Sequence, residues 1–172
     1  MSLSTTSGTL TALFTTALTL IAATTPAHAW VNPATGSPHA EAVVRPAQIP
    51  ERNWMPGHRG VDLHLTSGDE VKAAGAGEVA FVGMVVGVPT VSLVHPDGLR
   101  TTYQPVRTTL KVGEVVAEGA PLGTLAPWAK PDHTGLHWGV LVAKDTYIDP
   151  LTLLEAPVIR LKPVDAPGRR RA

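Results

Sequence analysis

The chain of 172 residues contains no cysteine, which excludes disulfide bonds and thiolate metal sites. Aromatic residues are few, whereas 16 glycines and 16 prolines indicate frequent turns between short elements. Neither sign of charge predominates, because 14 basic residues balance 14 acidic ones. This balance gives no reason to expect a nucleic acid or an anionic membrane surface as a partner. The length suffices for one domain with a substantial core.

The sequence also lacks an apolar run long enough for a membrane span. Its longest run, Leu10 to Ala23, is too short for that purpose but suits the apolar region of a signal peptide. Ala27-His28-Ala29 then provides a small-x-small cleavage pattern. We therefore expect cleavage after Ala29, no span in the mature chain, and a secreted or cell-envelope location. The first nine residues lack lysine and arginine, so an uncleaved anchor or a misassigned start codon stays open as an alternative.

Four segments follow from the composition. Residues 1–29 form the predicted signal peptide, and residues 30–57, rich in proline, alanine and glycine, form an extended N-terminal arm. Residues 58–156 carry the patterned part of the chain and form the predicted folded domain. Residues 157–172 end in three arginines and are predicted to be a basic, disordered tail.

Residues 58–156 show the pattern of an all-β protein. Short runs rich in β-branched residues alternate with glycine turns, and no long window has a helical apolar face. Pro96-Asp97-Gly98 between two such runs predicts a β-hairpin. Only Pro150 to Leu154 suggests a short helical turn. We expect few or no helices after removal of the signal peptide.

Two histidines and an aspartate form the most informative pattern. On an extended segment, His58 and Asp62 point to the same side, and Gly60 between them leaves room for a bound ion. Together with His137, they would make a minimal protein ligand set for a catalytic zinc ion, whose fourth position is left for water or substrate. The alternative is that the three side chains only form hydrogen bonds with one another.

The chain resembles the lysostaphin/LytM-type zinc metallopeptidases, which cut peptide cross-bridges in peptidoglycan. The resemblance covers roughly Arg45 to Leu154. The motifs that carry it are Pro56-Gly57-His58-Arg59-Gly60-Val61-Asp62, Gly68-Asp69-Glu70-Val71-Lys72-Ala73, Gly77-Glu78-Val79, Val94-His95-Pro96-Asp97-Gly98, Thr102-Tyr103, Gly119-Ala120-Pro121-Leu122-Gly123 and Leu136-His137-Trp138-Gly139. It implies an antiparallel sheet with a second small sheet, in a barrel-sandwich-like fold. It also implies that His58, Asp62 and His137 bind Zn²⁺.

Two further histidines of the family pattern are replaced in this chain. Pro105 stands where a Tyr-x-His motif on the central strand would end, and Gly135 stands two residues before the last ligand. In the family, those histidines position the attacking water and stabilise the oxyanion. His133, in the loop before His137, is our candidate for the general base. The alternative is an exposed loop histidine without a catalytic role.

Other candidate residues have ordinary explanations. His95 precedes a turn and is expected to be structural, and His64 is expected at the surface although it shares a strand face with Asp62. Trp54 and Trp138 could line a substrate groove or pack in the core. Arg59 is expected to face away from the metal and to form a structural ion pair; the alternative is that it binds a substrate carboxylate.

The combined pattern predicts an exported zinc metalloendopeptidase that cleaves peptide bonds in peptidoglycan cross-links or stems. The expected partners are peptidoglycan peptides, and the chain is expected to be a monomer. A catalytically degenerate zinc-binding domain, which binds wall peptides or regulates a wall amidase, stays open as the alternative. Two Gly-acid-x-Val turns also suggest a lipoyl or biotinyl carrier domain, but Lys72 and Lys111 do not lie at the hairpin tip that such a carrier requires.

Overall fold

The computed structural model describes residues 30–128 and 134–156. These residues form eleven β-strands and one short 3₁₀ helix. The strands are β1 (Val43–Arg45), β2 (Val61–Leu63), β3 (Glu70–Lys72), β4 (Gly77–Val85), β5 (Val88–Val94), β6 (Arg100–Gln104), β7 (Val106–Arg107), β8 (Val115–Val116), β9 (Pro121–Leu125), β10 (Leu136–Ala143) and β11 (Thr146–Ile148). The 3₁₀ helix η1 (Pro150–Leu153) follows β11, where the sequence suggested a helical turn.

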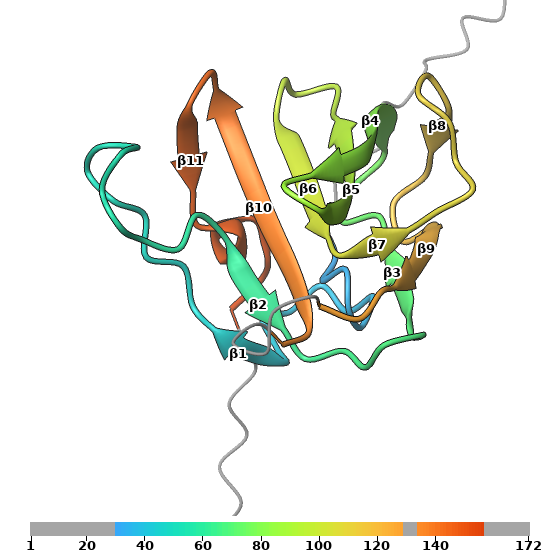
Figure 1. The fold of residues 1–172 in the computed structure, drawn as a ribbon, viewed down its shortest axis with the longest axis horizontal. Coiled ribbons are helices and arrows are strands. Elements are labelled where there is room, and N and C mark those ends of the chain that lie inside the picture. Colours follow the sequence, from blue (N-terminus) through green and yellow to red (C-terminus); the bar gives the residue numbers. More distant parts are fainter. Residues whose placement is uncertain (1–29, 129–133, 157–172) are drawn as a thin grey trace, which may run out of the picture.

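The strands form a large antiparallel sheet and a small one (Figure 1). The large sheet has the order β1-β2-β10-β6-β5-β4-β8, with β11 paired to β10, and the small sheet has the order β3-β9-β7. The turn Pro96-Asp97-Gly98 joins β5 to β6, and Gly98 adopts a φ of 86°, which glycine allows without strain. The predicted all-β fold with a second small sheet is therefore confirmed.

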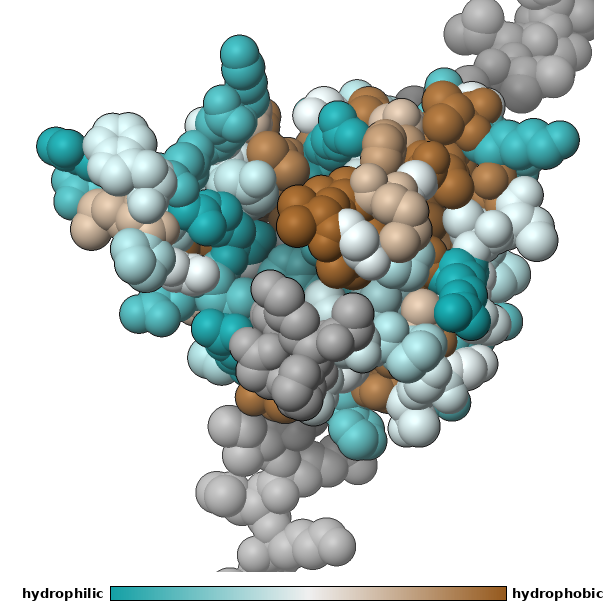
Figure 2. Space-filling model, in the orientation of Figure 1, coloured by the Kyte–Doolittle hydropathy of each residue, from teal (hydrophilic) through white to brown (hydrophobic). Residues whose placement is uncertain are grey.

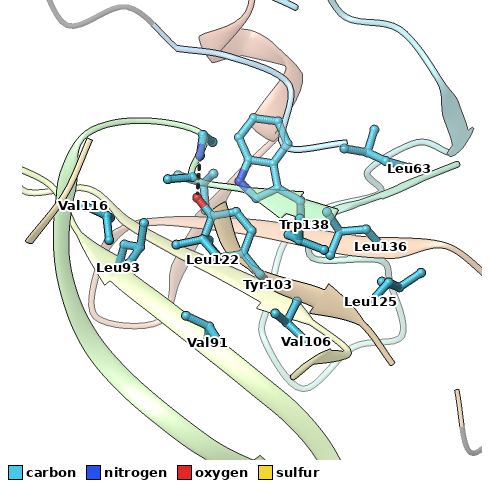
Figure 3. Close-up of a cluster of buried hydrophobic side chains, with 14 of the residues drawn as sticks. Leu63, Val91, Leu93, Tyr103, Val106, Val116, Leu122, Leu125, Leu136 and Trp138 are labelled. Carbon is cyan, nitrogen blue, oxygen red and sulfur yellow. Dashed lines mark hydrogen bonds between the residues drawn. The ribbon is translucent and has the colours of Figure 1, made fainter. Parts of the chain in front are cut away.

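The core contains apolar side chains from both sheets. Figure 3 shows Tyr103 and Trp138 of the large sheet beside Leu122 of the small sheet. The Tyr103 hydroxyl accepts a hydrogen bond of 3.0 Å from the Ala74 backbone N–H, the dashed line in Figure 3. Burial raises the pKa of Tyr103 to about 12, so the phenol stays neutral at physiological pH. This hydrogen bond ties β6 to the segment that follows β3.

Replacement of Tyr103 by phenylalanine should destabilise the protein without altering its core shape. The Ala74 N–H would lose its acceptor in a buried environment, which costs about 1–3 kcal/mol in the free energy of unfolding. Urea unfolding followed by tryptophan fluorescence measures this change. An unchanged free energy of unfolding would show that the hydrogen bond contributes nothing.

The predicted N-terminal arm packs against the domain. Val31 and Asn32 are buried, and β1 pairs with β2. A further bridge joins Gln48 to His58, so the arm fixes the backbone at the first ligand of the site. The predicted signal peptide and basic tail, residues 1–29 and 157–172, lie outside the described residues. Within residues 30–128 and 134–156, no helix has the length and hydropathy of a membrane span.

Candidate metal centre and groove

Three segments bring His58, Asp62 and His137 together. Asp62 is the middle residue of β2, and His137 lies directly opposite it on the antiparallel strand β10. Paired residues of antiparallel strands point to the same face, so both side chains meet on one side of the sheet. His58 precedes β2 and is held in position by its bridge to Gln48 of the arm. The pairing of β2 with β10 thus places Asp62 and His137, 75 positions apart in the sequence, side by side.

The three candidate ligand atoms form a compact triangle. The Asp62 Oδ1 atom lies 3.0 Å from His58 Nε2 and 2.9 Å from His137 Nδ1. The two ring nitrogens are 3.1 Å apart. His58 and Asp62 are 6% and 4% exposed, whereas the His137 side chain is 20% exposed. The group is able to hold a metal ion, and its His137 side faces solvent.

Contacts behind the triangle orient the His58 ring. The His58 Nδ1 atom lies 2.8 Å from the Pro46 carbonyl oxygen. Because a carbonyl only accepts hydrogen bonds, Nδ1 carries the proton and donates it to Pro46. Nε2 therefore presents a lone pair to the centre of the triangle. A hydrogen bond of this kind behind a histidine is the usual arrangement at protein metal sites.

The Asp62 carboxyl is an anion in this environment. Burial alone would raise its pKa, but the contacts of the carboxylate with the His137 and His58 imidazoles outweigh that effect. The pKa of Asp62 consequently lies below its ordinary value. The carboxylate thus adds a negative charge to the two imidazoles.

Gly60 and Gly135 explain two features of the sequence around the centre. A Cβ atom on Gly60 would overlap the Trp138 carbonyl oxygen and lie 2.8 Å from His137 Cε1, so only glycine lets His137 approach. Gly135 has a φ of 72°, and a Cβ atom there would overlap the Leu63 carbonyl group. The backbone at Gly135 therefore cannot accommodate a histidine two residues before His137.

A groove of about 440 Å³ runs over the sheet from His137. Its floor follows β10, β6 and β5, and Phe81 and Val85 of β4 form an apolar wall. Arg59 and Tyr147 lie on the opposite side. Figure 2 looks onto this face and shows hydrophobic residues gathered over the β4–β5 hairpin and hydrophilic ones across the hollow. The other lining residues are Thr90, Ser92, Arg100, Thr102, Gln104, His137, Gly139 and Leu141.

Gln104 is a groove residue that the sequence motifs did not indicate. It lies opposite His137 in the β6–β10 register, on the side of His137 away from Asp62. Its Nε2 atom donates a hydrogen bond of 2.7 Å to Thr90 Oγ1. The amide is therefore fixed beside the candidate metal centre. Only the strand register could have revealed this neighbour.

The remaining candidates fall in different positions. His133 lies outside the described residues. His64 is exposed, and His95 is buried, with its ring nitrogens 2.8 Å from Ala76 O and Thr101 Oγ1. Trp138 is fully buried in the core, whereas Trp54 is 78% exposed.

The prediction for Arg59 is wrong. Its guanidinium forms no ion pair with a described carboxylate, but donates hydrogen bonds to the backbone carbonyls of Asn53 and Met55. It also lines the groove, with its guanidinium carbon 6.0 Å from the Tyr147 ring centroid. The physical reason is that β2 begins only at Val61, so the strand alternation assumed for residues 58–60 does not apply.

Comparisons with known proteins agree with this fold. An uncharacterized protein of Mycobacterium tuberculosis is 44% identical over 137 residues, which cover 74% of this chain and 53% of that protein. The chain thus spans about half the length of the curated relatives it matches. The antimicrobial peptidase lysostaphin from Staphylococcus simulans is 27% identical, with a TM-score of 0.52 over 56% of this chain and 43% of that one.

A zinc containing peptidase from Vibrio cholerae has the same fold, with a TM-score of 0.56 at 20% identity over 67% of this chain and 37% of that one. The sequence pattern of peptidase family M23 matches residues 56–150, which include all three candidate ligands. The resemblance to lysostaphin-type peptidases is therefore confirmed, and the chain belongs to peptidase family M23.

Proposed function

We propose that this protein is an exported zinc metalloendopeptidase that cleaves peptide bonds in peptidoglycan cross-links or stems. The observation that carries the proposal is the triangle of His58, Asp62 and His137 at the head of a groove in a chain of peptidase family M23. Lysostaphin, a similar structure, is an antimicrobial peptidase, which supports a bacterial wall substrate.

The donor set fits zinc. Two neutral imidazole nitrogens and one carboxylate oxygen are typical protein ligands of a catalytic zinc ion. Tetrahedral bonds of about 2.0–2.1 Å separate such ligand atoms by about 3.3 Å, close to the separations of 2.9–3.1 Å in this triangle. When bound, zinc would polarise the scissile carbonyl and lower the pKa of water.

The groove would hold the substrate while His58, Asp62 and His137 hold the metal. Gly139 lines the groove without a side chain, so a peptide backbone can come close to the ligands. Gln104, fixed by Thr90, would donate an amide hydrogen to the oxygen of the scissile carbonyl. This amide would supply part of the stabilisation that a histidine provides elsewhere in the family.

Replacement of Gln104 by alanine should lower kcat by about 10²-fold with little change in KM, as expected for a donor that acts on the developing oxyanion. Steady-state cleavage of purified wall peptides measures both constants. Ser92→Ala is the control, because Ser92 lines the same groove and its hydroxyl contacts Thr102 rather than Gln104. A parallel loss of kcat in both variants would contradict the role of Gln104.

His133 retains its predicted role as general base in this proposal. The His133→Ala variant should bind zinc normally and cleave wall peptides about 10²–10⁴-fold more slowly. Cleavage by the variant at the wild-type rate would assign proton transfer to another group.

A second function is favoured by the residues that replace the two family histidines. With Pro105 and Gly135 at those positions, the domain could bind zinc and wall peptides, or regulate a wall amidase, without cleaving a bond. Digestion of purified peptidoglycan distinguishes the two functions. New peptide amino termini would support the peptidase, whereas binding to the wall without new termini would support the non-catalytic domain.

Export to the cell envelope completes the proposal, since peptidoglycan lies outside the cytoplasmic membrane. We propose that the signal peptide is cleaved after Ala29 and that the mature chain, a monomer, begins at Trp30. Amino-terminal sequencing of the protein recovered from the cell envelope tests this cleavage. An intact Met1 would instead support the uncleaved anchor.

A further inference from the structure

We propose that the end of the groove remote from the metal centre binds a carboxylate of the substrate, held between Arg59 and Arg100. The substrate class is then a peptide with a free carboxylate about four residues from the bond that is cut. This inference rests on the proposed peptidase function, because the metal centre defines where the cut bond lies. It adds a specificity site to the groove.

The sheet register sets the position of Arg100. Alternate residues of β10, from His137 through Gly139 to Leu141, line the groove. Arg100 lies opposite Leu141 on β6, so its side chain extends from the same face of the sheet. Leu141 follows His137 by four residues, and four residues of a strand span about 13 Å. Arg100, the partner of Leu141, therefore lies about four residues of an extended peptide away from the metal centre.

Arg59 approaches the same end of the groove from the other side. Tyr147 on β11 is the second register partner of Leu141, and the Arg59 guanidinium carbon lies 6.0 Å from the Tyr147 ring centroid. One guanidinium nitrogen, Nη2, is held by the backbone carbonyls of Asn53 and Met55. Arg59 therefore lies on the Tyr147 side of Leu141 and Arg100 on the other side. Arg59 is also anchored before any ligand binds.

The charges in the groove favour an anion. The described lining residues include the two cations Arg59 and Arg100 but no aspartate or glutamate. Asp145 shares an adjoining hollow with Arg100, but so does Lys144, and Arg100 forms no ion pair with any described carboxylate. A guanidinium presents paired N–H donors that match the two oxygens of a carboxylate. The site is therefore complementary to a peptide carboxylate.

The test compares stem peptides released from purified peptidoglycan with the same peptides after amidation of their carboxylates. Binding to the zinc-loaded full chain is measured by calorimetry, and cleavage is measured as new amino termini. Native peptides should bind about tenfold to a hundredfold more tightly than amidated ones, as expected for a lost charge-assisted contact. Added salt should reduce this preference, because the arginines are partly exposed.

Variants of Arg59 and Arg100 test whether the preference for native over amidated peptides arises in the groove. Arg59→Gln and Arg100→Gln should each weaken the preference for native peptides, and the double variant should abolish it. Arg107→Gln is the matched control, since Arg107 is an exposed arginine of the small sheet and lies outside this groove. An Arg100→Lys variant should retain part of the preference, because it keeps the charge and loses the paired donors.

The outcomes separate this proposal from the proposed peptidase function. Preferential binding of native peptides without cleavage would support the carboxylate site and contradict the peptidase. Cleavage with equal binding of both peptide forms would contradict the carboxylate site alone. The carboxylate site would also be overturned if neither form bound, or if the double variant kept the wild-type preference.

Discussion

Replacement of His58 by alanine should abolish stoichiometric zinc binding. His58 supplies one of three ligand atoms in the triangle with Asp62 and His137, and the two that remain hold an ion poorly. Loss of a single contact behind a ligand already reduces metal affinity by about 10–100-fold. We therefore expect the loss of a ligand itself to reduce zinc affinity by more than about 100-fold.

Zinc content after equilibrium dialysis measures this effect, and His64→Ala is the control. His64 is an exposed histidine two residues after Asp62, so its removal tests for nonspecific binding by surface imidazoles. Asp62→Asn offers a second variant that keeps the side-chain shape and removes the anionic charge. Wild-type zinc content in both His58→Ala and Asp62→Asn would contradict the metal centre.

Introduction of a histidine at Gly135 should destabilise the protein by about 3 kcal/mol or more and should not increase activity. The left-handed conformation of Gly135 disfavours any side chain, and a Cβ atom would also overlap the Leu63 carbonyl group. Leu63 belongs to β2, so a shift to relieve this overlap would disturb the strand that carries Asp62. The family histidine therefore requires a different backbone at this position.

The Gly98→His variant separates the cost of the left-handed backbone conformation from the cost of the overlap with the Leu63 carbonyl group. Gly98 has a φ of 86°, similar to that of Gly135, but nothing lies within 4 Å of a Cβ atom built on it. We expect Gly98→His to cost only about 1–2 kcal/mol, the penalty for a side chain in the left-handed region. Equal losses in the two variants, measured by urea unfolding, would contradict the steric role of Leu63.

Local sequence signals predicted much of the fold. The Asp97-Gly98 turn identified the hairpin between β5 and β6, because few residue pairs adopt the required backbone conformations. The short spacing of His58 and Asp62 indicated that their side chains could meet. His137 was a candidate third ligand by its chemistry, and its place beside them rested on the resemblance to a known family, because strand pairing across 75 residues leaves no local signal.

Features that depend on register or irregular backbone were not predicted. Gln104 lies beside His137 through the pairing of β6 with β10, and Arg100 reaches the groove through the same pairing. Arg59 was assigned to the wrong side because residues 58–60 were treated as a regular strand. The conformation that excludes a histidine at Gly135 likewise depends on the carbonyl of Leu63, a distant part of the chain.

Zinc titration of the metal-free protein during digestion of purified peptidoglycan tests the central proposal most directly. The release of new peptide amino termini should be absent without metal, rise with added zinc, and reach its maximum at one zinc ion per chain. Release that persists in the metal-free protein would contradict a zinc-dependent reaction. No release at any zinc concentration would contradict the assignment of the protein as a peptidoglycan endopeptidase.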